Sequence, residues 1–424
     1  MNNMVHKYLS NRATLFPWQI IGSDRKNFAA AVILPALDER ETLPKTLASL
    51  SKNPSGYLDT TLVVVVVNNR LGASTEALAE NQATLDWLQS NPFPQLNLAW
   101  IDACSPGLEL GAKDGVGLAR KIGFDASLSL LDWQIDPILI SLDADTLIDS
   151  TYLSAIFSHF QQSKAGGTAI PFHHQLARDE KQERAIRQYE LYLRSYMFGL
   201  QLAGSPYAYH TIGSAFACRA TAYIKSGGMN RRCGGEDFYF LQQVAKVSGV
   251  DLLSGTVVHP SPRFSDRVAF GTGKAVEAQV VDDLKLFDFV SADSFRVLQA
   301  WLKLAAGQIN KSADLVRDGA TELSAELTVF LDQLDFVDVW RKLQKNHSCS
   351  TRRLAAFHAW FDALRTRQLL TRLEKRRSLP AKKIIAELLE WGGYCDVQEP
   401  ELQLNLLERF YGVVPERKNR KPLS

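Results

Sequence analysis

Two short acidic motifs carry the residue types in this chain that could do chemistry. In the first, Gly234-Gly235 precedes Glu236-Asp237 and an apolar, helix-like run, so both acids are expected at a helix N-terminus. The helix dipole favours ionised carboxylates there, and the glycines let the backbone approach a ligand closely. One of the two acids could serve as a general base, although an acidic first turn after a glycine turn is also common without any catalytic role.

The second motif, Asp143-Ala144-Asp145, directly follows an apolar strand pattern. Two carboxylates on a tight turn supply hard oxygen ligands of the kind that Mg²⁺ and Mn²⁺ prefer. A cation held there could neutralise a leaving nucleoside diphosphate by Lewis-acid assistance, while the first motif removes a proton from an acceptor. Together the two motifs suit a single displacement at a sugar carbon, whose transition state resembles that of glycoside hydrolysis.

The elements that must position these motifs are strands and helices in alternation. Apolar strand patterns cover residues 29–34, 61–67, 96–101 and 137–142, with helical patterns near 43–50, 75–88 and 118–131 between them. Strands that are apolar throughout and alternate with helices predict an α/β fold with a parallel sheet covered on both faces. In such sheets, ligands bind beyond the carboxyl ends of the strands.

The polar residues that follow the strands are therefore the candidate site residues. They are Asp38 and Glu39 after the first strand, Asn68 and Asn69 after the second, and Asp143 and Asp145 after the fourth. Asp and Asn also form ordinary turns at such positions, so a single one of these residues says little. Three clusters expected at one edge of a sheet point more strongly to a binding site.

Beyond the fourth strand, the alternation of strands and helices continues to about residue 258, and a charged segment follows it. We expect a helix from residue 152, a strand ending near 171, a long polar helix over 179–202 and a final strand over 251–258. His259 directly follows this last strand, and Arg263 and Arg267 come soon after it. Arginine side chains there could clamp a phosphate or an anionic acceptor with two parallel hydrogen bonds, although surface arginines have the same sequence pattern.

Helical periodicity without strand patterns continues from about residue 281 onward. Helices are expected over 294–309, 320–343, 352–377 and 381–391. The sequence thus predicts an α/β domain over 1–280 and an all-helical domain over 281–424. Its basic residues form either a solvated face or a surface for an anionic membrane or acceptor; they are Arg341, Lys342, Lys345, Arg352, Arg353, Arg365, Arg367, Arg372, Lys375, Arg376, Arg377, Lys382 and Lys383.

Composition places the chain among ordinary folded proteins of 424 residues, with 46% hydrophobic and 22% charged residues and a net charge of +2. The five cysteines are scattered and never spaced as CxxC, which disfavours both a disulfide framework and a zinc knuckle. The longest apolar run, 62–67, is far too short to span a bilayer, and residues 1–24 have no signal-type apolar core. We therefore expect a cytoplasmic protein, which would reach a membrane only from its inner face.

Six sequence pieces, in this order and spacing, resemble a GT-A fold glycosyltransferase, closest in style to glycosyltransferase family 2. They are Val32-Ile33-Leu34-Pro35 with Glu39, Val63 to Val67 with Asn68, Gly117-Leu118-Ala119-Arg120, Asp143-Ala144-Asp145, Gly227-Gly228-Met229 and Gly234-Gly235-Glu236-Asp237. The resemblance covers the first two-thirds of the chain. It implies a Rossmann-like nucleotide-diphospho-sugar transferase domain and a hexosyltransferase-type enzyme. The implied partners are a UDP- or GDP-sugar donor, a hydroxyl acceptor, and Mn²⁺ or Mg²⁺ as cofactor.

The same resemblance implies a role for each matching residue. Asp143 and Asp145 would form the family's DxD motif, which binds the metal and the donor phosphates, Asp237 would be the catalytic base, and Glu236 would help to hold the acceptor. The other implied donor-binding residues are Pro35, Glu39, Asn68 and Arg120. The Gly-Gly-Glu-Asp run is also similar to that of the β-1,4-galactosyltransferases, whose third protein metal ligand is a downstream histidine. His259 is the matching candidate here.

The sequence departs from the family pattern in two places. Residues 35–39 lack the aromatic residue and the Asn that usually precede the Glu, which affects stacking on the nucleobase. Asn68-Asn69 replaces a common Asp pair, and an Asn carbonyl can accept from a uracil or guanine N–H without carrying charge. Both departures leave open which nucleobase the donor carries.

Alternative functions remain at this stage. One is a retaining enzyme of the same fold that acts on glycerate-type acceptors. A nucleotidyltransferase is less favoured, because no glycine-rich phosphate loop follows the first strand. Another is a non-catalytic adaptor whose basic helices bind a partner, a membrane or nucleic acid. Nucleic acid is the least favoured of these partners, because no aromatic residues are clearly interleaved with the basic ones.

Overall fold

The computed structural model describes residues 3–263, 287–374 and 379–413 and divides the chain into two compact units. The first takes the described residues of Met1–Ile186, Thr211–Leu284 and Tyr411–Ser424, and the second those of Arg187–His210 and Lys285–Phe410. The boundary expected at residue 280 lies outside the described residues, so the division into 1–280 and 281–424 stays a prediction.

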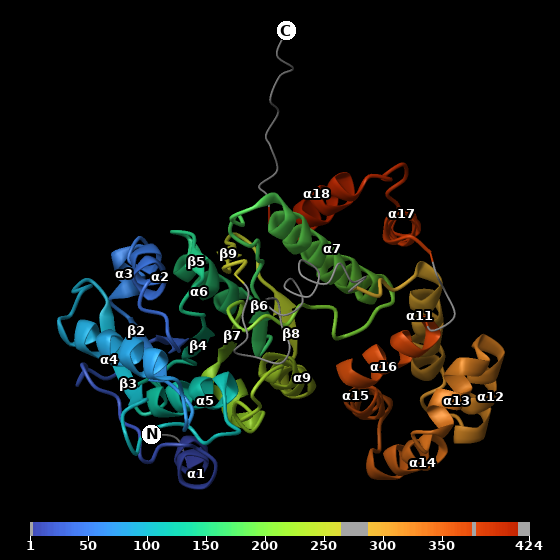
Figure 1. Ribbon diagram of the computed structural model, residues 1–424. Coiled ribbons are helices and arrows are strands. Elements are labelled where there is room, and N and C mark those ends of the chain that lie inside the picture. The colour runs from blue at the N-terminus through green and yellow to red at the C-terminus, as the bar shows by residue number, and fades with distance from the viewer. Residues whose placement is uncertain (1–2, 264–286, 375–378, 414–424) are drawn as a thin grey trace. The chain divides into compact units, whose positions relative to one another are not determined.

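A seven-stranded sheet, in the order β3-β2-β1-β4-β7-β6-β8, forms the centre of the first unit (Figure 1). Its strands are β1 (Ala30–Ala36), β2 (Thr61–Asn68), β3 (Asn97–Ala103), β4 (Ile138–Ser141), β6 (Gly167–Ala169), β7 (Phe216–Arg219) and β8 (Val250–Leu252). The pairs β1–β2, β2–β3 and β1–β4 are parallel, whereas β7 runs antiparallel to both β4 and β6. The α/β fold with a mostly parallel sheet and a helical C-terminal region is thus confirmed.

The single strand expected over 251–258 is wrong. The segment forms two short strands, β8 and β9 (Val258–His259), and β9 belongs to a separate two-stranded sheet with β5 (Leu147–Ile148). Gly255 lies between them with a φ of +91°, a left-handed conformation that breaks a strand. This break moves His259 from the edge of the main sheet to a position opposite Leu147.

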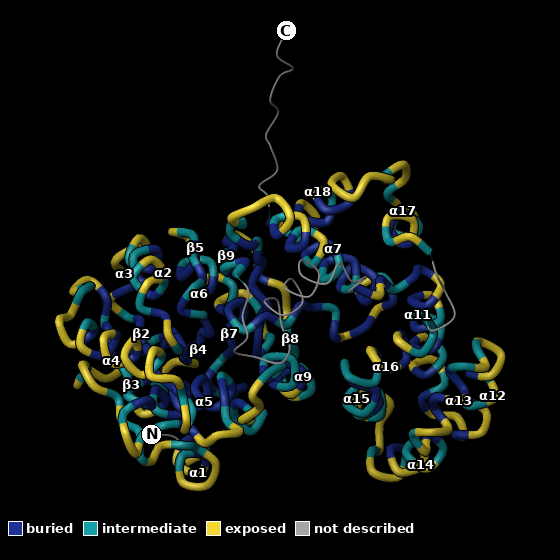
Figure 2. The backbone as a smooth tube through the Cα atoms, viewed as in Figure 1, coloured by how far each residue is buried: buried dark blue, intermediate teal, exposed yellow. Residues whose placement is uncertain are grey.

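Helices bury the strands of the first unit. They are α1 (Asn3–Asn11), α2 (Leu43–Leu50), α3 (Ser55–Leu58), α4 (Thr75–Gln89), α5 (Val116–Ser127), α6 (Tyr152–Gln162), α8 (Ala220–Lys225) and α9 (Glu236–Ser248), with the start of α7 (Glu180–Leu202). Helix α5 packs on β1 and β2, α4 on β2 and β3, and α9 on β6 and β8. Every residue of β1, β2 and β4 is buried, and Figure 2 shows dark blue stretches of backbone in the middle of this unit. Burial on both faces is the reason that these strands are apolar throughout.

The described residues of the second unit form helices joined by loops and contain no strand. Beyond the rest of α7 it contains α11 (Ala292–Gly307), α12 (Ala313–Leu323), α13 (Ala325–Asp332), α14 (Phe336–Asn346), α15 (Ser350–Trp360), α16 (Ala363–Glu374), α17 (Ala381–Trp391) and α18 (Pro400–Phe410). The single helix expected over 320–343 is wrong. Ser324 is extended and caps α13 with its hydroxyl, and Asp335 adopts a left-handed conformation before α14.

The single helix expected over 352–377 is also interrupted, because α15 ends at Trp360 and α16 begins at Ala363. Breaks of this kind leave the apolar periodicity almost unchanged, so the periodicity alone cannot reveal them. None of the helices in the described ranges combines the length and the apolar character that crossing a membrane requires.

Gly123 allows the close approach of α5 to the sheet, and its substitution tests this packing. An added Cβ would lie 2.4 Å from Cγ2 of Ile33 and 3.0 Å from Cγ2 of Val66. Alanine favours the helix by about 1 kcal/mol, but crowding a packed core costs about 1–3 kcal/mol. We expect G123A to lower the free energy of unfolding in urea. Gly56 has no neighbour within 4 Å, so G56A is the control and should be at least as stable as wild type. Equal stability of the two variants would contradict this packing.

Candidate active site

The Gly-Gly-Glu-Asp segment forms the start of α9. Gly235 is the N-cap residue, with φ 67° and ψ 17°, a left-handed conformation that a residue with a Cβ adopts only at a cost. Glu236 and Asp237 then occupy the first helical turn, and Oδ1 of Asp237 accepts a hydrogen bond of 2.7 Å from the backbone N–H of Phe238. Glu236 is buried, while Asp237 keeps part of its surface exposed.

The guanidinium of Arg120, on α5, joins the two acidic motifs. Its Nη1 pairs with Oε1 of Glu236, its Nη2 pairs with Oδ1 of Asp143, and its Nε donates to the Ser141 hydroxyl over 3.0 Å. Arg120 is only 2% exposed. Burial alone would lower the pKa of Arg120, but the adjacent carboxylates outweigh it and raise that pKa, so the guanidinium stays charged.

The acids at the start of α9 hold protons more tightly than ordinary carboxyl groups. Burial is the main cause that raises the pKa of Asp237, to about 7, and the charge of Glu236 adds to it. The charge of Arg120 and the N–H of Phe238 oppose this shift. Burial likewise raises the pKa of Glu236 against the opposing charge of Arg120. A carboxyl group with a pKa near neutrality is well matched to general-base catalysis at pH 7.

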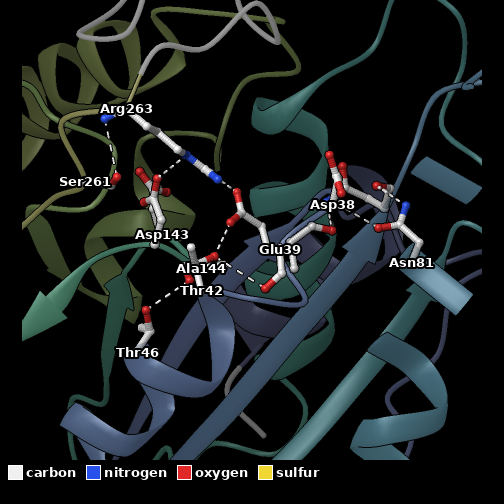
Figure 3. A network of polar contacts seen from close by, with 12 residues as sticks. Asp38, Glu39, Thr42, Thr46, Asn81, Asp143, Ala144, Ser261 and Arg263 are labelled. Carbon is white, nitrogen blue, oxygen red and sulfur yellow. Dashed lines mark hydrogen bonds and ion pairs between the residues drawn. The ribbon is translucent and has the colours of Figure 1, made fainter. Parts of the chain in front are cut away.

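Arg263 connects Asp145 to the loop that follows β1. Its Nε lies 2.9 Å from Oδ2 of Asp145, and its Nη2 pairs with Oε1 of Glu39. Figure 3 shows this arginine reaching from one side of the site toward Glu39, whose other carboxylate oxygen accepts from the Thr42 hydroxyl. Thr46 donates to the backbone carbonyl of Ala144 over 2.9 Å. The loop after β1 and the Asp143-Ala144-Asp145 turn are therefore held together.

His259 lies near this turn, but its ring faces other groups. Nδ1 is 2.9 Å from the carbonyl oxygen of His173 and must donate to it, which leaves Nε2 3.4 Å from Oδ1 of Asp149. The amide of Gln175 donates to the carbonyls of both Asp145 and His259, over 2.9 and 2.8 Å, and ties the two segments together.

A third polar group lies after β2 and includes a residue that the sequence analysis missed. The amide nitrogen of Asn81, on α4, donates to the Asn68 carbonyl over 3.1 Å and to Oδ1 of Asn69 over 3.0 Å. Oδ1 of Asn81 accepts from the N–H of Asp38 over 3.0 Å, as Figure 3 shows, and supports its left-handed φ of 55°. Asn68 donates its amide to the carbonyls of Ala36 and Val66, so its side chain is fixed.

Asn81 and a second missed residue, Ser141, carry signals that the sequence does contain. Asn81 shares one helix face with Leu85 and Leu88, where a buried amide needs partners, and Ser141 places a hydroxyl in an apolar strand. Of the expected site residues, Pro35 is buried within β1 opposite Val66. Arg267 lies outside the described residues.

A divalent cation suits the donor set at Asp143 and Asp145. Both residues are partly exposed, follow β4 and offer hard carboxylate oxygens, and each is paired with an arginine, Asp143 with Arg120 and Asp145 with Arg263. The ligand atoms of Asp143, Asp145 and His259 are not among the described groups that gather within 4.8 Å of one another. A ligand set with all three residues would therefore require side-chain movement.

The raised pKa of Asp237 predicts a pH-dependent stability. Its folded value near 7 lies above the ordinary value of about 4, so its contribution is fully present below pH 4 and is lost as the pH rises through 7. We expect the difference in melting temperature between D237N and wild type to become more positive by at least about 2 °C from pH 5 to pH 8. D59N, at an exposed carboxylate outside the site, controls for the loss of one charge. A difference that stays constant across this range would contradict the assignment.

Comparisons with known proteins return weak structural similarities that extend over most of the chain. No family model and no curated protein matches the chain. S. aureus TarS 1-349 in complex with UDP-GlcNAc is 12% identical with a TM-score of 0.38, over 92% of this chain and 93% of that one. The mannosyltransferase PcManGT from Pyrobaculum calidifontis, in complex with GDP-Man and Mn²⁺, is 15% identical with a TM-score of 0.35, over 97% and 93%. At these values the similarities assign neither a family nor an activity to this chain.

Proposed function

We propose that this protein is a metal-dependent, inverting glycosyltransferase that moves a sugar from a nucleoside-diphosphate sugar to a hydroxyl acceptor. The observation that carries the proposal is the joining of two acidic motifs, Asp143-Ala144-Asp145 and Glu236-Asp237, by one buried arginine, Arg120. The first motif lies at the carboxyl end of a parallel strand, where ligands of α/β sheets bind. The second presents a carboxyl group of raised pKa beside it.

The donor side of the proposed site is the edge that follows β1, β2 and β4. Asp143 and Asp145 would hold Mn²⁺ or Mg²⁺, and a cation bound there would neutralise charge on the departing diphosphate. Arg263 would exchange its pairing with Asp145 for the diphosphate oxygens. The carbonyl oxygen of the Asn68 side chain would accept a hydrogen bond from a ring N–H, which selects uracil or guanine over bases without that donor.

The acceptor side is the start of α9. Asp237 takes the proton of the acceptor hydroxyl, while the oxygen of that hydroxyl forms a bond to the anomeric carbon. The bond from this carbon to the diphosphate oxygen breaks at the same time, and its electron pair leaves with the nucleoside diphosphate. Attack on the face opposite the leaving group inverts the configuration. Glu236, fixed by Arg120, would orient the acceptor.

The remaining expectations extend the same proposal. From the sequence motifs and their order, we propose a cytoplasmic enzyme of the hexosyltransferase type that resembles glycosyltransferase family 2. Glu39 and Pro35 would shape the donor loop, and His259 would ligate the cation only after its ring leaves Asp149. Arg267 would act on phosphate or acceptor together with Arg263. The basic helical domain over 281–424 would contact an anionic surface.

Donor binding and turnover separate the proposed roles of the two motifs. With Mn²⁺ and a panel of UDP- and GDP-sugars, we expect D145N to weaken donor binding by about 10-fold or more, because it removes a charged metal ligand. D237N should leave donor binding nearly intact and lower turnover by a factor of about 10²–10⁴, the usual contribution of a general base. Calorimetry with nucleotide and release of nucleoside diphosphate measure the two effects.

Several outcomes would overturn the assignments. Normal turnover by D237N would remove Asp237 as the base. Failure of every nucleotide sugar to bind with any divalent cation would remove the enzyme proposal itself. Once a donor is known, NMR of the product anomer decides between inversion and retention. Retention would support the alternative function, a retaining glycosyltransferase of the same fold.

A further inference from the structure

We infer that Arg120 is a positioning residue that couples the donor side of the site to its acceptor side, through simultaneous pairing with Asp143 and Glu236. The inference rests on the proposed function for the identity of the ligands. A donor-binding arginine would present its guanidinium to solvent, whereas all three donating nitrogens of Arg120 are engaged by protein groups. Arg120 would then act on the donor through Asp143.

The guanidinium of Arg120 is held in a fixed cradle. The Ser141 hydroxyl accepts from its Nε over 3.0 Å and donates to the carbonyl of Gly213 over 2.7 Å. A Cβ on Gly213 would lie 2.3 Å from Nη2 of Arg120, so only glycine leaves room for the guanidinium at this place. The guanidinium therefore cannot follow one of its carboxylates without loosening its hold on the other.

The planar fork of Arg120 divides one positive charge between two chain segments. Nη1 serves Glu236 at the start of α9, and Nη2 serves Asp143 after β4. In a site of low dielectric constant such pairs are strong, and a single point charge could not serve both carboxylates with the same geometry. The attraction that Asp143 feels from Arg120 consequently depends on whether Glu236 is ionised and present.

This dependence gives Glu236 an effect on the donor side. A divalent cation must draw Asp143 partly away from Arg120. When Glu236 loses its charge, Asp143 is the one ionised carboxylate that still pairs directly with the guanidinium, which then competes more strongly with the cation. Donor binding that uses Asp143 then becomes weaker, although Glu236 lies on the acceptor side.

Asp237 offers a matched control on the same helical turn. It carries the same charge as Glu236 one residue later, but its Oδ1 accepts from the backbone N–H of Phe238. At pH 8, where Asp237 is mostly ionised, substitution of either acid removes one negative charge near the donor, so long-range electrostatics affects both variants similarly. Only the Glu236 substitution also changes the pairing of Arg120.

The first experiment measures the affinity of the full chain for UDP and GDP with Mn²⁺ by calorimetry. We expect E236Q to weaken binding by about 5- to 20-fold, within the usual range of coupling between sites, and D237N to weaken it by no more than about twofold. In an R120K background, which keeps the charge but loses the fork, the difference between E236Q and D237N should disappear. S141A, which removes the acceptor of Nε, should reduce the difference and serves if R120K does not fold.

The second experiment needs no ligand. Thermal melting of D143N, E236Q and the double variant should give shifts that fail to add by at least about 2 °C, because both residues share one arginine. In the R120K background the shifts should add, and in the S141A background they should come closer to adding. If Arg120 instead contacts the donor directly and does not couple Asp143 to Glu236, the melting shifts should add in every background.

Three results would overturn the inference. They are equal loss of affinity in E236Q and D237N, a difference between these variants that survives in R120K and S141A, and additive melting shifts in the otherwise wild-type chain. If the wild type binds neither UDP nor GDP with Mn²⁺, the proposed nucleotide binding is wrong, and the melting experiment alone decides whether Arg120 couples Asp143 to Glu236. The two failures are thereby distinguishable.

Discussion

The charge of one buried guanidinium among three carboxyl groups is the constraint on which the candidate site depends. Arg120 pairs directly with Asp143 and Glu236, and Asp237 lies in the same electrostatic field. One positive charge cannot compensate three neighbouring negative ones, so a proton is retained more tightly where burial is deep and compensation is poor. Burial is the main cause of the raised pKa of Asp237, and the charge of Glu236 adds to it. A base of suitable strength thus results from burial together with the arrangement of charges.

The fold supplies this arrangement by bringing helix starts and a strand end to one place. Helix α5 carries Arg120 in its second turn, β4 ends just before Asp143, and α9 begins at Glu236. Gly117 lets the segment before α9 approach α5, since a Cβ there would lie 2.4 Å from the Arg232 carbonyl oxygen. The two glycines before Glu236 have a different role, because Gly235 supplies the left-handed turn that starts α9. Glycines that look like ordinary turn residues in the sequence are therefore steric or conformational requirements of one site.

The sequence predicts most of the parallel sheet but little of the pairing within the site. Strands buried on both faces leave continuous apolar runs such as 61–67, which local pattern reveals. The antiparallel β7 and the helix breaks at Ser324 and Asp335 escape this reasoning, because tertiary contacts and single backbone conformations decide them. The family resemblance implies a donor-binding role for Arg120, while its pairing with Glu236 joins residues 116 positions apart, a relation that spacing cannot show.

The same charge imbalance links the stability of the protein to its proposed chemistry. A site with a surplus of carboxylates is least favourable when no cation is bound and every acid is ionised, since the arginines then compensate only part of the negative charge. Any ligand that brings positive charge to Asp143 and Asp145 relieves this repulsion and stabilises the folded state by mass action. The arginines that now pair with these acids provide the relief while no such ligand is bound. Arg120 is buried and fixed, whereas Arg263 is a third exposed, so Arg263 is the arginine that can yield its place to a cation or diphosphate without disrupting the core.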